Sequence, residues 1–194
     1  MDWAHVPLFA HIRWANLSHS DLINLSRFRS VTVQVEPDAP IPCEAQATDI
    51  QTKLATVGSP TRTFIYGNVH FGEPNCAYFK LLAQNPWMWL NDTTGKPVMP
   101  AGRYEWDWSV PGVPQWYVQH VIMAPGVEGG FGDSGCGDLG PSFWNASRQQ
   151  AYAAGQREAH ALATAELAAL PEPGTYIANC PILPRNGDPP PWRA

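Results

Sequence analysis

The sequence predicts a parallel α/β fold, because short apolar segments alternate along it with stretches of helical character. Five segments are apolar or β-branched, and each of them ends in or beside a polar residue. Continuous apolar runs are typical of strands that are buried on both faces, as in a parallel sheet. The five expected strands are residues 6–12, 30–36, 61–68, 129–133 and 174–180.

Each interval between these strands contains a stretch that predicts at least one helix. Ser20 and Ser147 are candidate N-caps of the first and the last stretch. The third stretch begins at Pro74, and proline is favoured in the first turn of a helix. The last stretch is rich in alanine, and its narrow stripe of small residues suits close packing on a sheet. The expected helices are residues 19–28, 44–57, 74–84, 112–123 and 147–170, with an irregular insert over 85–111.

Length and charge exclude several classes of protein. The 194 residues are enough for one domain with a substantial core, and the sequence has no run of 18 apolar residues that could span a membrane. The net charge is −5 and the 12 basic residues form no cluster, so we expect neither a nucleic-acid nor a membrane partner. The six histidines are scattered and the sequence has no CxxC, HxH or HExxH motif, so we expect no metal site and no cofactor.

Composition hints at secretion without establishing it. Charged residues make up only 15% of the chain, which also has 9 Trp and 20 Pro, and this composition is similar to that of secreted carbohydrate-active proteins. Against an exported chain, Met1 is followed by no basic or apolar signal segment. In favour of export, N-x-[ST] sequons begin at Asn16, Asn24, Asn91 and Asn145.

The four cysteines allow two interpretations. They are Cys43, Cys76, Cys136 and Cys180, an even number that forms either two disulfides or four free thiols. If they are oxidised, we expect Cys43 to pair with Cys76 and Cys136 to pair with Cys180. The reason is that the two members of each pair follow neighbouring strands at the same end of the sheet.

Several segments resemble, in their order, those of a group of TIM-barrel proteins, the hypothetical glycosyl hydrolases related to endo-α-1,4-polygalactosaminidases. The resemblance covers roughly residues 3–182, and no single motif in it is specific. In that group an Asp-x-[ST]-x-Pro segment precedes the helix before strand four, which ends in G-x-F-x-D. The matching segments are FIYGNVHF (64–71), NPWMWLNDTTGKPV (85–98), YEWDWSVPGVPQWYVQHVI (104–122) with its DWSVP (107–111), GGFGDSG (129–135) and YIANCPI (176–182) with its ANCP (178–181).

The resemblance implies a sugar-cleaving (β/α) barrel with one acid after strand four and a partner acid on a later strand. A complete barrel has eight strands in about 250 residues. We therefore expect a partial barrel over residues 1–183 and a Pro-rich tail over 184–194. Because the later strand is absent, we expect no turnover by this chain alone and self-association through its open sheet edge. The rival interpretation is a non-catalytic carbohydrate-binding or scaffold remnant.

Polar residues at the ends of the strands are the first candidates for this chemistry, because α/β proteins place their active sites at the carboxyl ends of parallel strands. Asp133 ends the fourth strand and is our candidate catalytic carboxylate, and the alternative is an acid that fixes a turn. Glu36, Asn68 and Asn179 end three other strands and are candidate substrate ligands. Each of them has a structural alternative as a loop or turn residue.

Four further residues are weaker candidates for substrate binding. Tyr66 and His70 lie two residues before and after the end of strand three, so they share one face with it, and a structural histidine is the alternative for His70. Asp107 lies between two tryptophans and could bind sugar hydroxyls, with Trp106 as an apolar platform. The alternatives are a helix N-cap for Asp107 and core packing for Trp106.

The segment GDSG (132–135) also resembles the serine neighbourhood of two hydrolase classes. One class needs an all-β fold, which the alternating pattern excludes, and the other needs a downstream Asp-x-x-His motif that the sequence lacks. Without a general base, Ser134 is an ordinary hydroxyl. A serine hydrolase is therefore the least favoured interpretation.

Overall fold

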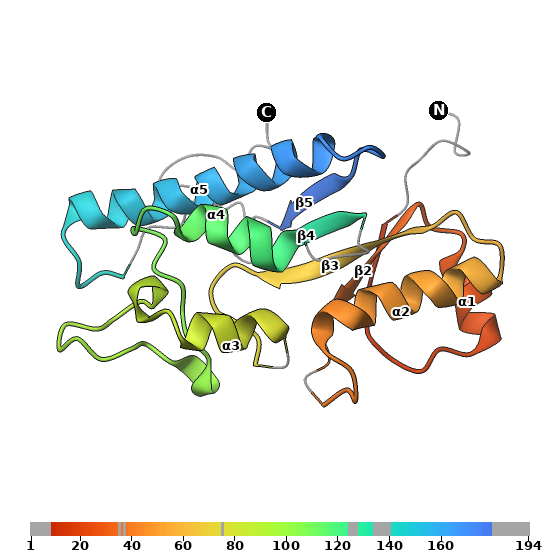
Figure 1. Cartoon of the computed structure of the whole chain (residues 1–194), viewed down its shortest axis with the longest axis horizontal. Helices are drawn as coiled ribbons and strands as arrows, with labels where there is room; N and C mark the ends of the chain where they lie inside the picture. The colour runs from red at the N-terminus through yellow and green to blue at the C-terminus, as the bar shows by residue number, and fades with distance from the viewer. Residues whose placement is uncertain are drawn as a thin grey trace, which may run out of the picture.

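The expected strands form one five-stranded parallel sheet in chain order (Figure 1). The computed structural model describes residues 9–34, 36, 38–74, 76–123, 128–133 and 141–179. Every neighbouring pair of strands is parallel, which confirms the predicted α/β architecture. The strands are β1 (Phe9–Arg13), β2 (Ser30–Gln34), β3 (Arg62–Asn68), β4 (Gly129–Asp133) and β5 (Thr175–Asn179).

Helices connect the strands at the expected places. The connection from β3 to β4 is the longest, and it carries two helices and the insert. There the last α-helix continues directly into a π-helical turn, Val118–Ile122. The α-helices are α1 (His19–Leu25), α2 (Cys43–Thr56), α3 (Ala77–Ala83), α4 (Val113–Tyr117) and α5 (Ala146–Ala168).

Two predicted N-caps were wrong by two residues, and one predicted helix start was wrong by three. The N-cap of α1 is Ser18, not Ser20, because Ser18 and Asp21 form a reciprocal capping box. Asn145, not Ser147, caps α5 by accepting a hydrogen bond from the backbone N–H of Arg148. The segment after Pro74 is extended at its cap residue, and α3 begins only at Ala77.

The sheet is strongly curved. In a flat sheet β1 and β4 would be three strand spacings apart, which is about 14 Å. The ring centroids of Phe9 on β1 and Phe131 on β4 are only 5.8 Å apart, and the rings are stacked. The two side chains therefore face one another across a concave surface, as they would in part of a barrel.

The helices cover the other, convex face of the sheet. Beside β1 and β2, Ile50 and Leu54 of α2 pack in one buried cluster with Val31 and Val33. Beside β3 to β5, the π-helical turn and α4 and α5 form a second, larger cluster. Figure 1 shows this division, with α1 and α2 beside β1 to β3, and α4 and α5 beside β4 and β5.

The insert over 85–111 is anchored to the rest of the fold by Trp106 and Trp108 and by two ion pairs, one of which joins Arg103 to Glu73. Trp106 and Trp108 are fully buried in the larger cluster. The carboxylate of Asp107, between them, is 2.7 Å from Nη2 of Arg148 on α5. Helix α5 approaches so closely that a Cβ at Gly155 would clash with the carbonyl oxygen of Trp108.

Some expectations fall outside the described residues. The Pro-rich tail at 184–194, Ser134, and the pair Cys136 and Cys180 all do so. In the part of the chain that the structure describes, no helix combines the length and the apolar character needed to cross a membrane.

Candidate functional site

The carboxyl end of the sheet brings three of the predicted polar residues side by side. In the strand register, Asn68 of β3 pairs with Asp133 of β4, and Asp133 pairs with Asn179 of β5. The amide of Asn179 donates a hydrogen bond to Oδ1 of Asp133 at 2.7 Å. The hydroxyl of Tyr66 donates to Oδ2 at 2.7 Å. Both oxygens of Asp133 are thus held by donors from its two neighbouring strands.

The hydroxyl of Tyr66 is a hydrogen-bond donor over a wide pH range. Burial raises the pKa of Tyr66, and its hydrogen bond to Asp133 and the negative charges of Asp133 and Glu73 raise it further. The hydroxyl therefore stays protonated at physiological pH and can donate only one hydrogen bond at a time. Because that bond goes to Asp133, Tyr66 fixes the orientation of the carboxylate.

Asn68 organises the chain where it leaves β3. Its Oδ1 accepts hydrogen bonds from the backbone N–H groups of His70 at 2.8 Å and Phe71 at 3.2 Å. Its amide nitrogen lies 3.4 Å from the hydroxyl of Tyr66. Asn68 therefore links the loop after β3 to the Tyr66–Asp133 pair, and only 7% of its surface is exposed.

Asp133 opens onto a groove of about 460 Å³ on the concave face. The groove joins aromatic, apolar and polar side chains from β1, β4 and β5. Phe131 lies within ring contact of His11 and of Tyr66, at centroid distances of 5.4 and 6.1 Å. The lining residues are Phe9, His11, Phe131, Asp133, Ile177, Ala178 and Asn179.

A second groove continues along the same face toward the amino ends of the strands. It has a volume of about 280 Å³ and shares Phe9 and Ile177 with the first. Its polar lining includes Arg29 and Arg62. The guanidinium of Arg62 is already engaged by the carboxylate of Glu128 at 2.9 Å. An elongated ligand in contact with Asp133 would therefore have a continuous surface to follow.

Glu36 and His70 lie near this end of the sheet but differ from the expectation. β2 ends at Gln34, so Glu36 belongs to the following loop, and its carboxylate lies 3.8 Å from Nη1 of Arg13. The backbone N–H of His70 donates a hydrogen bond to Oδ1 of Asn68, and the side chain of His70 is half-buried. Both residues flank the site, and their expected roles as substrate ligands stay predictions.

The structure places Trp106 and Asp107 in the interior. Trp106 has no exposed surface, so it offers no ring face to a ligand. Asp107 accepts hydrogen bonds from the backbone and the hydroxyl of Ser109, and pairs with Arg148. It is not a helix cap either, since Gly112 is the cap residue of α4. Trp106 and Asp107 are both interior because the insert folds back over α4 and buries them.

The sequence did not single out Glu73 or the groove residues Phe9 and His11. Phe9 and His11 alternate on β1, a pattern that could have placed both of them on the concave face. Glu73 lies in the loop after β3, where no periodic signal exists. Its carboxylate is 3.4 Å from Nη1 of Arg103, and its side chain is 12% exposed. Burial raises the pKa of Glu73, while Arg103 opposes this shift.

Comparisons with known proteins define the fold class. No protein-family model matches the sequence, and no curated protein matches it. The galactosidase domain of an α-galactosidase–sucrose kinase superposes with a TM-score of 0.55 and 10% identity, over 91% of this chain and 27% of its own. A Geobacillus stearothermophilus GH36 α-galactosidase in complex with stachyose has a TM-score of 0.52 and 10% identity, over 89% and 27%.

A third structure extends the likeness to another glycosidase family. The Flavobacterium johnsoniae GH31 dextranase complexed with isomaltotriose has a TM-score of 0.52 and 10% identity, over 90% of this chain and 25% of its own. The chain thus spans about a quarter of the length of these proteins. At this identity the likeness establishes the fold alone, which is part of a TIM barrel of the kind found in glycoside hydrolases.

Proposed function

We propose that this is a carbohydrate-active barrel protein in which Asp133 is the acting carboxylate. The observation that carries the proposal is the double anchoring of Asp133 by Tyr66 and Asn179 at the carboxyl end of the sheet. A carboxylate whose two oxygens both accept hydrogen bonds is held in one orientation. We assign Asp133 the role of base or nucleophile of glycosidic cleavage rather than that of the acid.

The concave groove supports a sugar as the ligand. Phe9 is 38% exposed and its ring stacks on that of Phe131, so the groove presents an apolar aromatic surface beside a carboxylate and an amide. Sugar rings have apolar faces and polar edges, and aromatic side chains next to hydrogen-bonding groups match both. The fold likeness to glycosidases crystallised with stachyose and isomaltotriose agrees with this choice of ligand.

Glu73 is the candidate for the second carboxylate. Its negative charge contributes to the raised pKa of Tyr66, the residue whose hydroxyl donates to Asp133. A general acid must hold its proton near neutral pH, and burial raises the pKa of Glu73 in the required direction. Arg103 opposes that shift, so loss of the Arg103–Glu73 ion pair when a ligand binds would raise the pKa of Glu73 further.

Stachyose and isomaltotriose are the first ligands to test, by calorimetric titration and by chromatography of the products. We expect binding by the wild-type chain and its loss in Asp133→Asn, which replaces one hydrogen-bond acceptor by a donor. Asp92→Asn is the matched control, because Asp92 caps a turn in the insert. If Asp133→Asn binds both sugars with unchanged affinity, Asp133 is not the acting residue.

Hydrolysis decides between an enzyme and a binding module. Product formation that is lost in both Asp133→Asn and Glu73→Gln would establish catalysis by this pair. Binding without products would establish the non-catalytic alternative, with Asp133 as a ligand to sugar hydroxyls. If a broad glycan array also gives no binding, the proposal of a carbohydrate ligand is wrong.

A further inference from the structure

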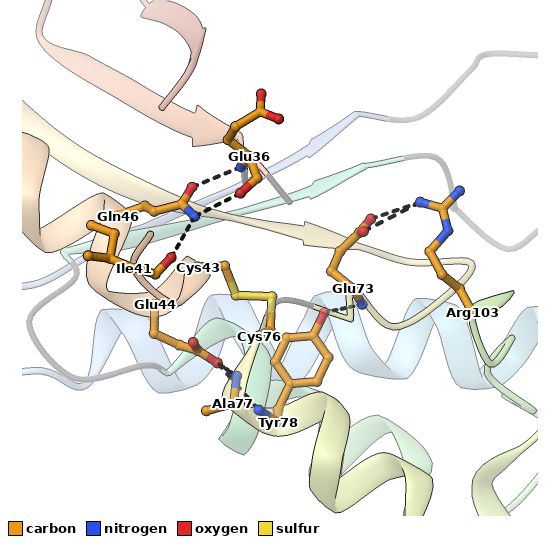
Figure 2. The surroundings of a disulfide bond; sticks show 10 residues. All are labelled: Glu36, Ile41, Cys43, Glu44, Gln46, Glu73, Cys76, Ala77, Tyr78 and Arg103. Atoms are coloured by element: carbon orange, nitrogen blue, oxygen red, sulfur yellow. Dashed lines mark hydrogen bonds and ion pairs between the residues drawn. A yellow bond between two sulfur atoms is a disulfide. The ribbon is translucent and has the colours of Figure 1, made fainter. Parts of the chain in front are cut away.

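A disulfide joins the loops that follow β2 and β3, and a carboxylate lies against it (Figure 2). Cys43 begins α2, and Cys76 is the cap residue of α3. Both are buried, with 1% and 2% of their surface exposed, and their Cα atoms are 4.9 Å apart. This confirms the expected Cys43–Cys76 pair.

Glu44 completes a cluster of three metal-ligand types. The two Sγ atoms and a carboxylate oxygen of Glu44 all lie within 4.8 Å of one another. Oε1 of Glu44 accepts a hydrogen bond from the backbone N–H of Ala77 at 2.8 Å, which caps α3. Oε2 is buried and has no hydrogen-bond partner among the described residues. A buried oxygen without a donor is costly, and a cation or a thiol proton would satisfy it.

Non-covalent contacts hold both cysteines independently of the S–S bond. The side chain of Gln46, on α2, holds the segment that precedes this helix. It accepts a hydrogen bond from the N–H of Glu36 at 2.9 Å and donates to the carbonyls of Glu36 and Ile41 at 3.1 Å (Figure 2). Before α3, the N–H of Cys76 donates to the carbonyl of Glu73. Reduction of the disulfide would therefore leave two thiols and a carboxylate in place.

We propose that the reduced protein binds a thiophilic divalent cation, Zn²⁺ or its probe Co²⁺, through Cys43, Cys76 and Glu44. Tetrahedral zinc takes S–Zn bonds of about 2.3 Å and O–Zn bonds of about 2.0–2.2 Å, which puts two coordinating sulfurs about 3.8 Å apart. The present cluster is within reach of that geometry after small side-chain rotations. Glu44 also lines an open surface depression with Ala45 and Thr48, so one of the three ligand residues borders on solvent.

The redox step is an exchange with a dithiol. The S–S bond between Cys43 and Cys76 breaks and takes up two electrons and two protons. The dithiol reductant supplies them and closes its own disulfide. Binding of the metal ion then displaces the two thiol protons to solvent. A water molecule would fill the fourth position, since the three protein ligands leave it open.

This cluster could not be predicted from the sequence, because its two cysteines are 33 positions apart. Zinc sites are recognised in sequences by closely spaced ligands such as CxxC. Here the short spacing exists only in the fold, where the parallel strands β2 and β3 bring the starts of two successive helices together. The expectation of no metal site is thus replaced, for the reduced protein only, by this proposal.

Cobalt binding tests the site directly. The chain carrying Cys136→Ser and Cys180→Ser is reduced with dithiothreitol, desalted without air and titrated with Co²⁺. We expect one Co²⁺ per chain, with a thiolate-to-cobalt charge-transfer band and the visible bands of tetrahedral cobalt, and none before reduction. Cys43→Ser should abolish the bands, and Glu44→Gln should weaken binding about tenfold or more. Glu166→Gln, on the exposed face of α5, is the matched control.

A second readout uses the chain with all its cysteines. After reduction, Zn²⁺ should protect Cys43 and Cys76 from alkylation, as read for each peptide by mass spectrometry, and Glu44→Gln should lower that protection. The proposal is overturned by an octahedral cobalt spectrum, by equal affinity in Glu44→Gln and Glu166→Gln, or by the same binding before and after reduction. Circular dichroism of each variant distinguishes a lost ligand from a lost fold.

Discussion

The hydroxyl of Tyr66 donates a hydrogen bond to Oδ2 of Asp133 over 2.7 Å, and this bond joins β3 to β4 at the carboxyl end of the sheet. It connects a side chain that is 7% exposed to one that opens onto the concave groove. The orientation of the Asp133 carboxylate is therefore fixed by a buried neighbouring side chain. Preorganisation of this kind is what a carboxylate needs if it is to act on a bound ligand.

Tyr66→Phe should test this relationship. We expect a loss of about 1 kcal/mol in the free energy of unfolding, which is typical of one hydrogen bond. We expect a larger relative loss in carbohydrate affinity, because Asp133 would no longer be fixed. Urea denaturation and calorimetry measure the two effects. Tyr104→Phe makes the same chemical change in the insert, where the ring stacks on Trp89, and should leave carbohydrate affinity unchanged.

The buried tyrosines should make the protein labile in alkali. Burial raises the pKa of Tyr66, Tyr78, Tyr117 and Tyr176 above the ordinary value of about 10. Above that pH the unfolded chain loses these protons while the folded chain keeps them, so the free energy of unfolding falls as pH rises. The expected slope is about 1.4 kcal/mol per pH unit for each tyrosine.

One variant isolates a single tyrosine in that pH dependence. The hydroxyl of Tyr117 is buried without a hydrogen-bond partner among the described residues. Tyr117→Phe should therefore change the free energy of unfolding little or not at all at neutral pH. Above about pH 10 it should reduce the slope of that free energy against pH by the contribution of one tyrosine, about 1.4 kcal/mol per pH unit. Urea melts at about pH 8 and at increasing pH beyond about 10 measure both. An unchanged slope would show that Tyr117 ionises in the folded chain.

The disulfide should contribute substantially to stability. It closes a loop of 33 residues, for which the chain-entropy model gives about 3–4 kcal/mol. We expect the Cys43→Ser, Cys76→Ser double variant to lose about that much free energy of unfolding, and yet to fold, because Gln46 and Glu44 hold the same loops. Denaturant titration of this variant against the wild-type chain, both free of metal, gives the value.

Gly155→Ala should destabilise the protein even though alanine is the better helix former. The substitution gains about 1 kcal/mol of helix propensity. The added Cβ, however, would overlap the carbonyl oxygen of Trp108, a backbone atom that cannot rotate away. Overpacking costs about 1–3 kcal/mol or more, so the net change should be unfavourable. A rise in the melting temperature would mean that α5 and the insert can separate.

The strands were predictable because each is a short apolar run that ends in polar residues. Helix starts were less so, since Ser18 and Ser20 are both good caps in the sequence and only the reciprocal bond with Asp21 distinguishes them. The neighbours of Asp133 on adjacent strands were predictable from the shared parallel register. Their roles in carbohydrate binding remain proposals.

The other contacts near the site, those of Glu73 and Trp106, could not be predicted from hydrophobic periodicity. Glu73 and Arg103 lie 30 positions apart, with α3 and most of the insert between them, and no local spacing encodes such a contact. The sequence offers Trp106 as a candidate platform for a sugar ring, because sequence alone does not distinguish an exposed tryptophan from a buried one. Only the path of the insert over α4 decides that its ring is enclosed.

The identity between strand order and chain order has a kinetic consequence. Each strand after β1 pairs with the edge of the strand that was synthesised just before it, and no strand has to enter between two others. A chain emerging from the ribosome can therefore add one strand–helix unit at a time, from the N-terminus onward. The interval from Asn68 to Gly129 is the longest between successive strands, so its closure carries the largest entropic cost of any step. We therefore expect the docking of β4 onto β3 to be the slowest of these steps, and α5 and β5 to dock only after it.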